Sequence, residues 1–159
     1  MPPRLLVRKR LRSLAALELV NIPLQAFVWF GLLGLPASAA NLTGFAAFAL
    51  LLVQGAAYWA AKLRQIDAGG PLPGAVVFAA ALRANPAVLV AAVLFTGWSA
   101  VADPGRSAFL GLGFALFAVL EHVNYFHVQL MYDNRADLRR LAAHGPARSH
   151  LSRDLARRP

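Results

Sequence analysis

The sequence predicts an all-α fold, a four-transmembrane-helix bundle with a short interfacial helix between the second and third spans. The composition is the first observation behind this prediction. Of the 159 residues, 58% are hydrophobic and 14% are Asp, Glu, Lys or Arg, whereas soluble domains have about 45–50% apolar and about 25% charged residues. The other two observations concern position. The apolar residues collect in four long stretches, and the basic residues collect between alternate stretches.

The four apolar stretches cover approximately residues 14–35, 42–61, 86–101 and 107–131. A helix that crosses the hydrocarbon core needs about 20 largely apolar residues, and the first, second and fourth stretches have this length. The third is shorter, so we expect it to extend backwards or to cross a locally thinned bilayer. Helices are expected because every backbone polar group in lipid must be bonded within its span.

The start of the first stretch also looks like a secretory signal. It follows basic residues and precedes the small residues Ala37, Ser38 and Ala39. The apolar region of a signal has about 7–15 residues, which is shorter than this stretch. The stretch also contains several polar residues and a proline. We therefore expect an uncleaved first helix.

The charges indicate how the spans are oriented. The chain has 16 Lys and Arg against 7 Asp and Glu, a net charge of +9. All the basic residues except Arg106 lie before the first span, between the second and third spans, or after the fourth. The positive-inside rule then places both termini in the cytoplasm, an N-in/C-in topology that only an even number of spans allows.

Two segments outside the main spans have their own predictions. A turn-rich segment precedes residues 75–84, which we expect to form a short helix along the cytoplasmic surface before Pro86 opens the third span. One long helix kinked at Pro86 is the alternative. After a membrane domain of residues 1–133, residues 134–159 are expected to form a basic cytoplasmic tail. A capped helix could begin at Asp133 or Asn134, and residues 149–158 form a second basic turn or remain disordered.

The expected partners follow from the basic segments. Each basic residue near an anionic membrane surface contributes about 1 kcal/mol of binding. The residues expected to contact lipid headgroups are Arg8, Lys9, Arg10, Arg12, Arg135, Arg139 and Arg140. A second copy of the chain or another membrane protein is a further expected partner. Nucleic acid is not expected, because the basic tail lacks interleaved aromatic residues.

Polar side chains inside the spans carry the most information about function, because they are costly in lipid. They lie on one face of the first helix, on one face of the second, and throughout the end of the fourth. The candidate residues are Glu18, Asn21, Gln25, Gln54, Tyr58, Glu121, His122, Asn124, Tyr125, His127 and Gln129. Counted from the cytoplasmic ends, Gln25 lies level with Glu121. We therefore expect one polar cluster, open to the cytoplasm if to anything.

Three interpretations of this cluster remain open. In the first, the side chains hydrogen-bond to each other and hold the helices together, at about 0.6 kcal/mol each, with a protonated Glu121 bonded to Gln25. In the second, Glu121 and the imidazoles form a transport or proton pathway. In the third, a membrane enzyme holds a lipid headgroup or isoprenoid against Glu121, Asn124 and His127. We favour the first, a non-enzymatic protein that acts through helix contacts or self-association.

No metal site or cofactor is predicted. The chain has no cysteine, which excludes thiolate ligands and a cysteine nucleophile. On an ideal helix His122 and His127 lie about 140° apart, so they do not easily ligate one metal ion. No other proposed span contains a histidine, which argues against a haem held by two imidazoles of one copy.

The end of the fourth span carries a resemblance. Residues 124–133 read Asn-Tyr-Phe-His-Val-Gln-Leu-Met-Tyr-Asp, and the basic tail follows them. This segment resembles the end of a family of small, uncharacterised bacterial multi-pass membrane proteins, over about the last quarter of the chain. The resemblance implies a bacterial host, and hence the bacterial cytoplasmic membrane. It implies no activity and no functional residue.

Overall fold

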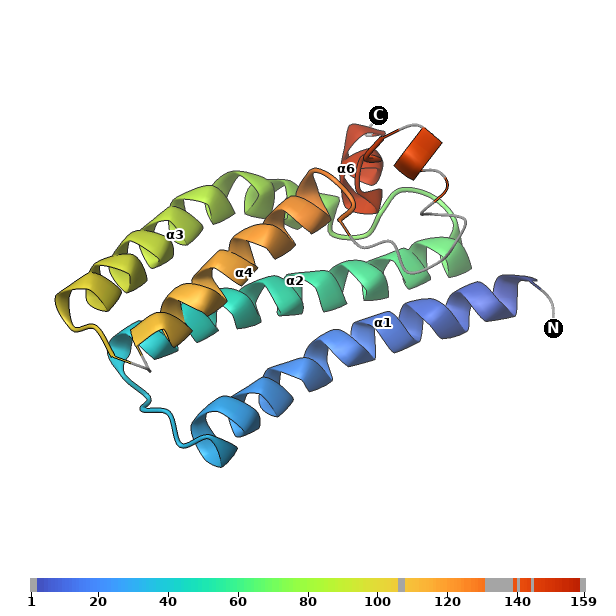
Figure 1. The fold of residues 1–159 in the computed structure, drawn as a ribbon. Coiled ribbons are helices and arrows are strands. Elements are labelled where there is room, and N and C mark those ends of the chain that lie inside the picture. Colours follow the sequence, from blue (N-terminus) through green and yellow to red (C-terminus); the bar gives the residue numbers. More distant parts are fainter. Residues whose placement is uncertain (1–2, 106–107, 131–138, 140, 144, 158–159) are drawn as a thin grey trace.

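The computed structural model describes residues 3–105, 108–130, 139, 141–143 and 145–157 (Figure 1). The elements are α1 (Pro3–Ala26), the π-helical turn η1 (Phe27–Leu32), α2 (Ala39–Ala68), α3 (Ala75–Ala102), α4 (Ala108–Phe126) and α6 (His150–Ala156).

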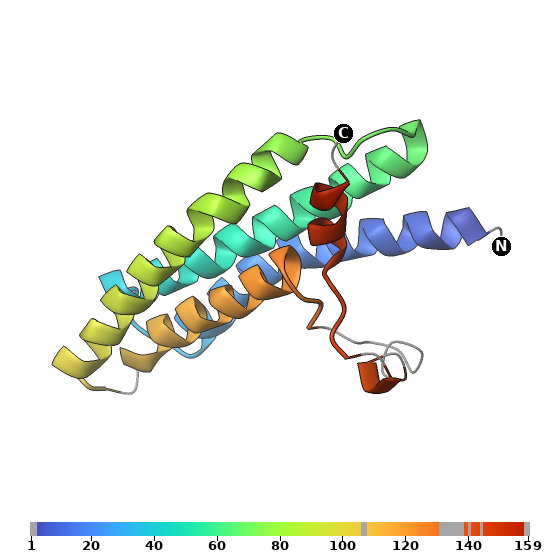
Figure 2. The same cartoon turned by 90° about the horizontal axis from the view of Figure 1, so that it is seen from above.

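The hydropathy and length of the helices agree with the predicted all-α membrane fold. Four helices are long and apolar enough to cross a membrane, namely Arg4–Leu32, Ala39–Ala68, Ala75–Ala102 and Ala108–Phe126. Helix α2 lies centrally and packs against α1, α3 and α4, whereas α1 packs mainly against α2 (Figures 1 and 2). The all-α bundle is therefore confirmed, and the chain is a polytopic membrane protein by this criterion. Its orientation across the bilayer stays a prediction.

Helices α2 and α4 approach each other closely at two glycines, Gly44 and Gly111. A Cβ atom on Gly44 would lie 2.8 Å from the Cα atom of Gly111, so only glycine fits there. Asn41 fixes the register of this contact. Its side-chain oxygen accepts a hydrogen bond from the Gly111 amide at 3.0 Å, and its amide donates to the Pro36 carbonyl at 2.8 Å. The two helices are thus joined at the end opposite to the basic residues.

The expected division of residues 75–101 into an interfacial helix and a short third span is corrected. Helix α3 runs without interruption through Pro86, so the alternative of one long helix is the right one. Contacts with α2 hold the segment that leads into the proline. Before it, the Phe78 ring packs against Tyr58 with centroids 6.0 Å apart, and next to it Asn85 bonds to Gln54. The proline is tolerated because neighbouring helices stabilise the segment.

The C-terminal segment also differs from the expected basic tail. Helix α4 ends at Phe126, and the chain returns to pair with the residues that follow it. The Gln129 amide donates to the Ala147 carbonyl at 2.9 Å, and the Ser149 amide donates to the His127 carbonyl at 3.0 Å. Helix α6 then packs across the end of the bundle (Figure 2), with the Leu151 side chain buried. The cap expected at Asp133 or Asn134 lies outside the described residues.

Candidate functional site

The candidate polar residues do not form one cluster. Instead, the structure divides most of them among separate contacts between different helices. The amide group consists of Gln54, Asn85 and His122. The Glu18–Tyr125 pair joins α1 to α4, and the Asp154 group consists of Tyr58, Lys62 and Asp154. The first contact belongs to the packed interior, whereas the other two border a cavity.

The amide group ties three helices together. Gln54 donates to the Asn85 side-chain oxygen at 3.1 Å, and Asn85 donates back to Gln54 at 2.7 Å. The Asn85 amide also lies 3.4 Å from Nδ1 of His122, which accepts when its hydrogen is on Nε2. Asn85 and His122 are both buried. Sequence reasoning missed Asn85. The third span was expected to begin at Pro86, which left Asn85 outside the span, whereas the structure has it inside the continuous helix α3.

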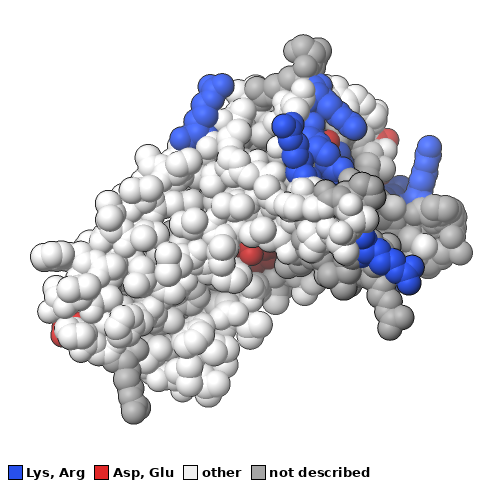
Figure 3. Space-filling model, turned by 45° about the horizontal axis from the view of Figure 1, so that its top comes forward, with Lys and Arg blue, Asp and Glu red and all other residues white. Residues whose placement is uncertain are grey.

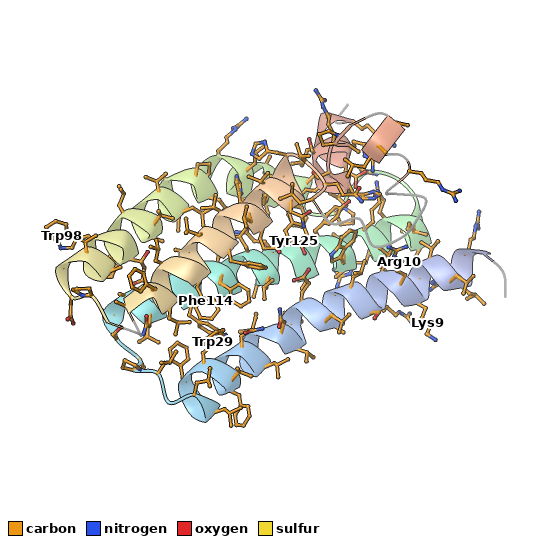
Figure 4. All side chains as sticks on the ribbon, in the orientation of Figure 1. Lys9, Arg10, Trp29, Trp98, Phe114 and Tyr125 are labelled. Carbon is orange, nitrogen blue, oxygen red and sulfur yellow. The ribbon has the colours of Figure 1, made fainter. Side chains whose placement is uncertain are left out.

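The Glu18–Tyr125 pair is the polar contact between α1 and α4. The Tyr125 hydroxyl donates to a Glu18 carboxylate oxygen. Tyr125 reaches α1 because it crosses α2 at Gly55, where the absence of a side chain leaves room for the ring. Tyr125 and Arg10 both lie between α1 and the other helices (Figure 4).

Gln25 does not bond to Glu121, which corrects the expected pairing. Gln25 donates to Asn21 at 3.2 Å and accepts from the Trp29 indole at 2.7 Å. Both partners lie four residues away on the same helical face, where side chains are neighbours. Glu121 likewise accepts from Asn124, three residues away, at 3.4 Å. Neither side chain therefore needs a partner from the other helix.

The separation expected between the two histidines is also corrected. The His122 and His127 rings contact each other, with centroids 5.3 Å apart and planes at 71°. The expected separation assumed a helix up to residue 131, but α4 ends at Phe126 and His127 leaves the helical path. Within the described part of the chain, no group of three or more His, Asp and Glu residues could hold a metal ion.

The Asp154 group attaches α6 to α2. The Tyr58 hydroxyl donates to Asp154 at 2.9 Å, and the Lys62 ammonium donates to both carboxylate oxygens at 2.8 and 2.7 Å. Asp154 is almost fully buried, with 9% of its side chain exposed. Sequence reasoning included Tyr58 but missed Lys62 and Asp154. The available signal was an acidic residue that interrupts an otherwise basic segment.

A cavity of about 520 Å³ lies between α1, α2, the end of α4 and α6. Of the candidate residues, Glu18, Tyr58, Asn124, Tyr125 and Gln129 line it, and the others do not. Apolar side chains from three helices complete the walls. These are Val7, Leu11, Leu14, Trp59, Ile66 and Leu151. The cavity is therefore amphipathic, with hydrogen-bonding groups and hydrocarbon surface in one half-open pocket.

The same cavity has a basic lining. Arg10, Lys62 and Arg153 contribute to its wall from α1, α2 and α6. On the face drawn in Figure 3, Lys and Arg gather toward the end that carries α6. The pKa of His150, which also lines the cavity, lies below its ordinary value of 6.5, because the ring is partly withdrawn from water and because Arg153 adds positive charge. The charge of Arg153 thus acts on His150 at this end of the cavity, and Asp154 opposes it.

The basic residues expected at the lipid surface have different positions. Arg8 pairs with Asp67 on α2 at 3.1 Å, and Arg10 faces the cavity. Lys9, Arg12 and Arg139 are exposed. The remaining two, Arg135 and Arg140, lie outside the described residues.

Comparison of the chain with family models, characterised proteins and solved structures finds no match. The resemblance of residues 124–133 to a bacterial membrane family thus stays a prediction.

Proposed function

We propose that this protein is a non-enzymatic membrane protein that binds an amphiphilic molecule taken from the bilayer. The observation that carries the proposal is the amphipathic cavity between α1, α2, α4 and α6. Binding sites of this size are mostly apolar, with a few polar groups that orient the ligand. In this proposal the protein lies in the bacterial cytoplasmic membrane, with both termini in the cytoplasm.

The position of α1 supports entry of such a ligand from the side. Helix α1 packs mainly against α2, and none of the most apolar part of its span is buried. One wall of the cavity is therefore a helix whose outer face is free to contact lipid. The inner face offers Leu11 and Leu14 to a hydrocarbon chain, and Glu18 lies further along the same face.

The remaining polar groups support a structural role. Gln54, Asn85 and His122 bond to each other inside the bundle, and Asp154 is held by Tyr58 and Lys62. Such bonds between membrane helices stabilise the fold by about 0.6 kcal/mol each. These contacts agree with the first of the three interpretations of the polar residues. Self-association stays a prediction.

The transport and enzyme alternatives receive less support. Both assigned the central role to Glu121, which does not line the cavity and accepts from Asn124 on its own helix. Of the residues assigned to the enzyme, Asn124 alone lines the cavity. The candidate reacting groups are thus not assembled around one substrate position.

Trp59 provides a test, because it lines the cavity. Replacing Trp29 and Trp98 by Phe leaves Trp59 as the sole tryptophan of the three. In nanodiscs that contain phosphatidylcholine with a nitroxide on its acyl chain, the label is expected to quench Trp59 fluorescence. Leu14→Phe narrows the cavity and should weaken the quenching. Leu17→Phe is the matched control, since Leu17 is 61% exposed on the outer face of α1.

The comparison of the two variants decides the proposal. Quenching that falls in Leu14→Phe and persists in Leu17→Phe supports an acyl chain inside the cavity. Equal quenching in the parent and both variants would contradict it, because contact with bulk lipid around the protein would then explain the signal.

A further inference from the structure

We infer that the cavity selects an amphiphile whose head carries a hydroxyl group, because Glu18 and Asn124 offer such a head one hydrogen-bond acceptor and one donor. The inference rests on the proposed function and adds the chemical class of the ligand. Both residues line the cavity, Glu18 from α1 and Asn124 from α4. Each of them is bonded within the protein at one position and has a second polar group left over.

Glu18 keeps one carboxylate oxygen for a ligand. Its Oε1 accepts from the Tyr125 hydroxyl. In the described part of the chain no residue donates to Oε2, and no Lys or Arg there forms an ion pair with Glu18. The buried side-chain atoms without a partner in that part of the chain belong to Trp59, Gln65 and His122. Oε2 of Glu18 is not one of them, so it keeps contact with the open space of the cavity.

Asn124 keeps one amide hydrogen for a ligand. Its Nδ2 donates to Glu121 at 3.4 Å, and its Oδ1 accepts from the Leu130 backbone amide at 2.9 Å. The second of these bonds fixes which side of the amide group carries the oxygen. A side-chain amide has two N–H hydrogens, and the bond to Glu121 uses one of them. The other is a donor that is held in place in the cavity wall.

The acceptor and the donor lie at the same level of the cavity. Asn124 directly precedes Tyr125 on α4, and Tyr125 bonds to Glu18 on α1. Glu121, which accepts from Asn124, also acts electrostatically on Glu18. A ligand head at this level therefore meets both groups, one from each helix.

A hydroxyl group matches this pair. With the same oxygen atom it can donate to the carboxylate and accept from the amide. An ammonium group donates only, and an ester or a phosphodiester accepts only, so each of these heads would leave one group of the protein without a partner. A site built to bond a hydroxyl rejects ligands that lack it for this reason.

The apolar wall beside Glu18 suits the chain of such a ligand. Leu14 and Leu11 lie four and seven residues before Glu18, which places them on the same face of the helix. Both line the cavity. A lipid alcohol satisfies the two polar groups with its head and this apolar face with its chain.

The test uses the single-tryptophan protein in nanodiscs of phosphatidylcholine. The probes are a long-chain alcohol with a nitroxide on its chain and the methyl ether of the same labelled alcohol. Both are uncharged and nearly equal in length, and the ether lacks the hydroxyl hydrogen. The alcohol is expected to quench Trp59 at a concentration lower by on the order of tenfold, because a hydrogen bond to a carboxylate is charge-assisted.

Two cavity variants and one control test the residues. Glu18→Leu should abolish the preference for the alcohol, and Glu18→Gln should retain part of it, because the amide oxygen still accepts. Asn124→Leu should also reduce the preference, and it leaves the contact between Glu18 and Tyr125 in place. Asn21→Leu is the matched control, since Asn21 is a polar residue of the same helix outside the cavity lining. Its preference should equal that of the parent, and melting temperatures establish that all variants are folded.

Several results would overturn the inference. A preference that survives in Glu18→Leu, or that falls equally in Asn21→Leu, would mean that the alcohol is not bonded to Glu18. Stronger quenching by a labelled long-chain amine than by the alcohol would assign a cationic head to the site. Relief of the quenching by glycerol, which has hydroxyl groups without a chain, would replace the lipid by a soluble polyol.

The outcomes also distinguish the inference from the proposed function. Equal quenching by the alcohol and the ether in the parent, reduced by Leu14→Phe, would overturn the inference and keep the proposed function. Absence of Leu14-sensitive quenching by either probe would overturn both.

Discussion

The Tyr125 ring crosses α2 directly above Gly55. A Cβ atom on residue 55 would lie 2.5 Å from both Cζ and Oη of Tyr125, closer than non-bonded atoms approach. The missing side chain lets Tyr125 extend from α4 past α2 to the Glu18 carboxylate on α1. Gly55 therefore decides whether α1 is bonded to the rest of the bundle through this pair.

Gly55→Ala is expected to destabilise the protein by about 1–3 kcal/mol, because an added methyl group forces the Tyr125 ring to move. The measurement is the free energy of unfolding in detergent micelles. Gly113→Ala is the control, since no atom outside its own helix lies within 4 Å of a Cβ placed there. That variant should be neutral or more stable by roughly 0.5–1 kcal/mol. Equal effects of the two changes would contradict the role of Gly55.

The number and type of the helices could be predicted from the sequence, because length and hydropathy depend on each segment alone. One error in this part came from Pro86, and another from the end of α4, which was expected at residue 131 and lies at Phe126. A proline inside a helix usually kinks or breaks it, but here Phe78 and Asn85 attach the segment before it to α2. Such support comes from other helices, and the local sequence does not contain it.

The partners of the polar side chains were harder to predict for the same reason. The polar residues of α1 and of α2 were correctly assigned to one face of each helix. Their partners were not, because Gln25 bonds within its own helix and Tyr58 bonds to Asp154, far along the chain. The position of His127 depends on where α4 ends. A helix end is fixed by the residues that hydrogen-bond to its last, otherwise unpaired, backbone carbonyl groups. Here those residues come from the returning C-terminal segment.

Asn85→Leu is expected to lower the free energy of unfolding by about 1–3 kcal/mol, because it leaves the partly buried Gln54 amide and the buried His122 Nδ1 without this partner. The double variant Gln54→Leu/Asn85→Leu removes both amides, so its loss should be smaller than the sum of the single losses. The measurement is a double-mutant cycle in micelles. Additive losses would show that the two amides are not coupled.

Asp154→Asn is expected to release α6 from the bundle. The change removes the charge that Tyr58 and Lys62 bind, and hydrogen bonds to a charged group contribute about 1.5–3 kcal/mol. Amide hydrogen exchange in residues 150–156 should become faster, while exchange in α2 and α4 stays slow. The measurement is hydrogen exchange followed by mass spectrometry.

Asp67→Asn is the control for this change, because Asp67 also pairs with a basic residue from another helix. Its partner is Arg8, and both side chains are well exposed at 37% and 41%. Exposed ion pairs contribute about 0–1 kcal/mol, so exchange should hardly change. Faster exchange in α6 after Asp67→Asn would argue against a specific role of Asp154.

His150 makes the docking of α6 dependent on pH. Its pKa in the folded protein is below 6.5, because it is partly withdrawn from water and lies near Arg153, Lys62 and Arg10. The neutral ring is therefore favoured in the docked state. The contribution of the neutral His150 ring to the stability of docked α6 is complete above pH 6.5. It is lost as the pH falls through the lowered pKa of His150. Hydrogen exchange in α6 should accordingly become faster at acidic pH.

Arg153→Gln tests the cause of this shift. It removes the nearest donor to Nδ1 of His150 and one of the positive charges, so the pKa of His150 should rise towards 6.5. The measurement is an NMR titration of the labelled histidine side chain. Arg148→Gln removes an exposed charge that is not among those acting on His150, and its titration should match the parent. Identical titrations for both variants would mean that withdrawal from water alone lowers the pKa, and that Arg153 adds little positive potential at the cavity.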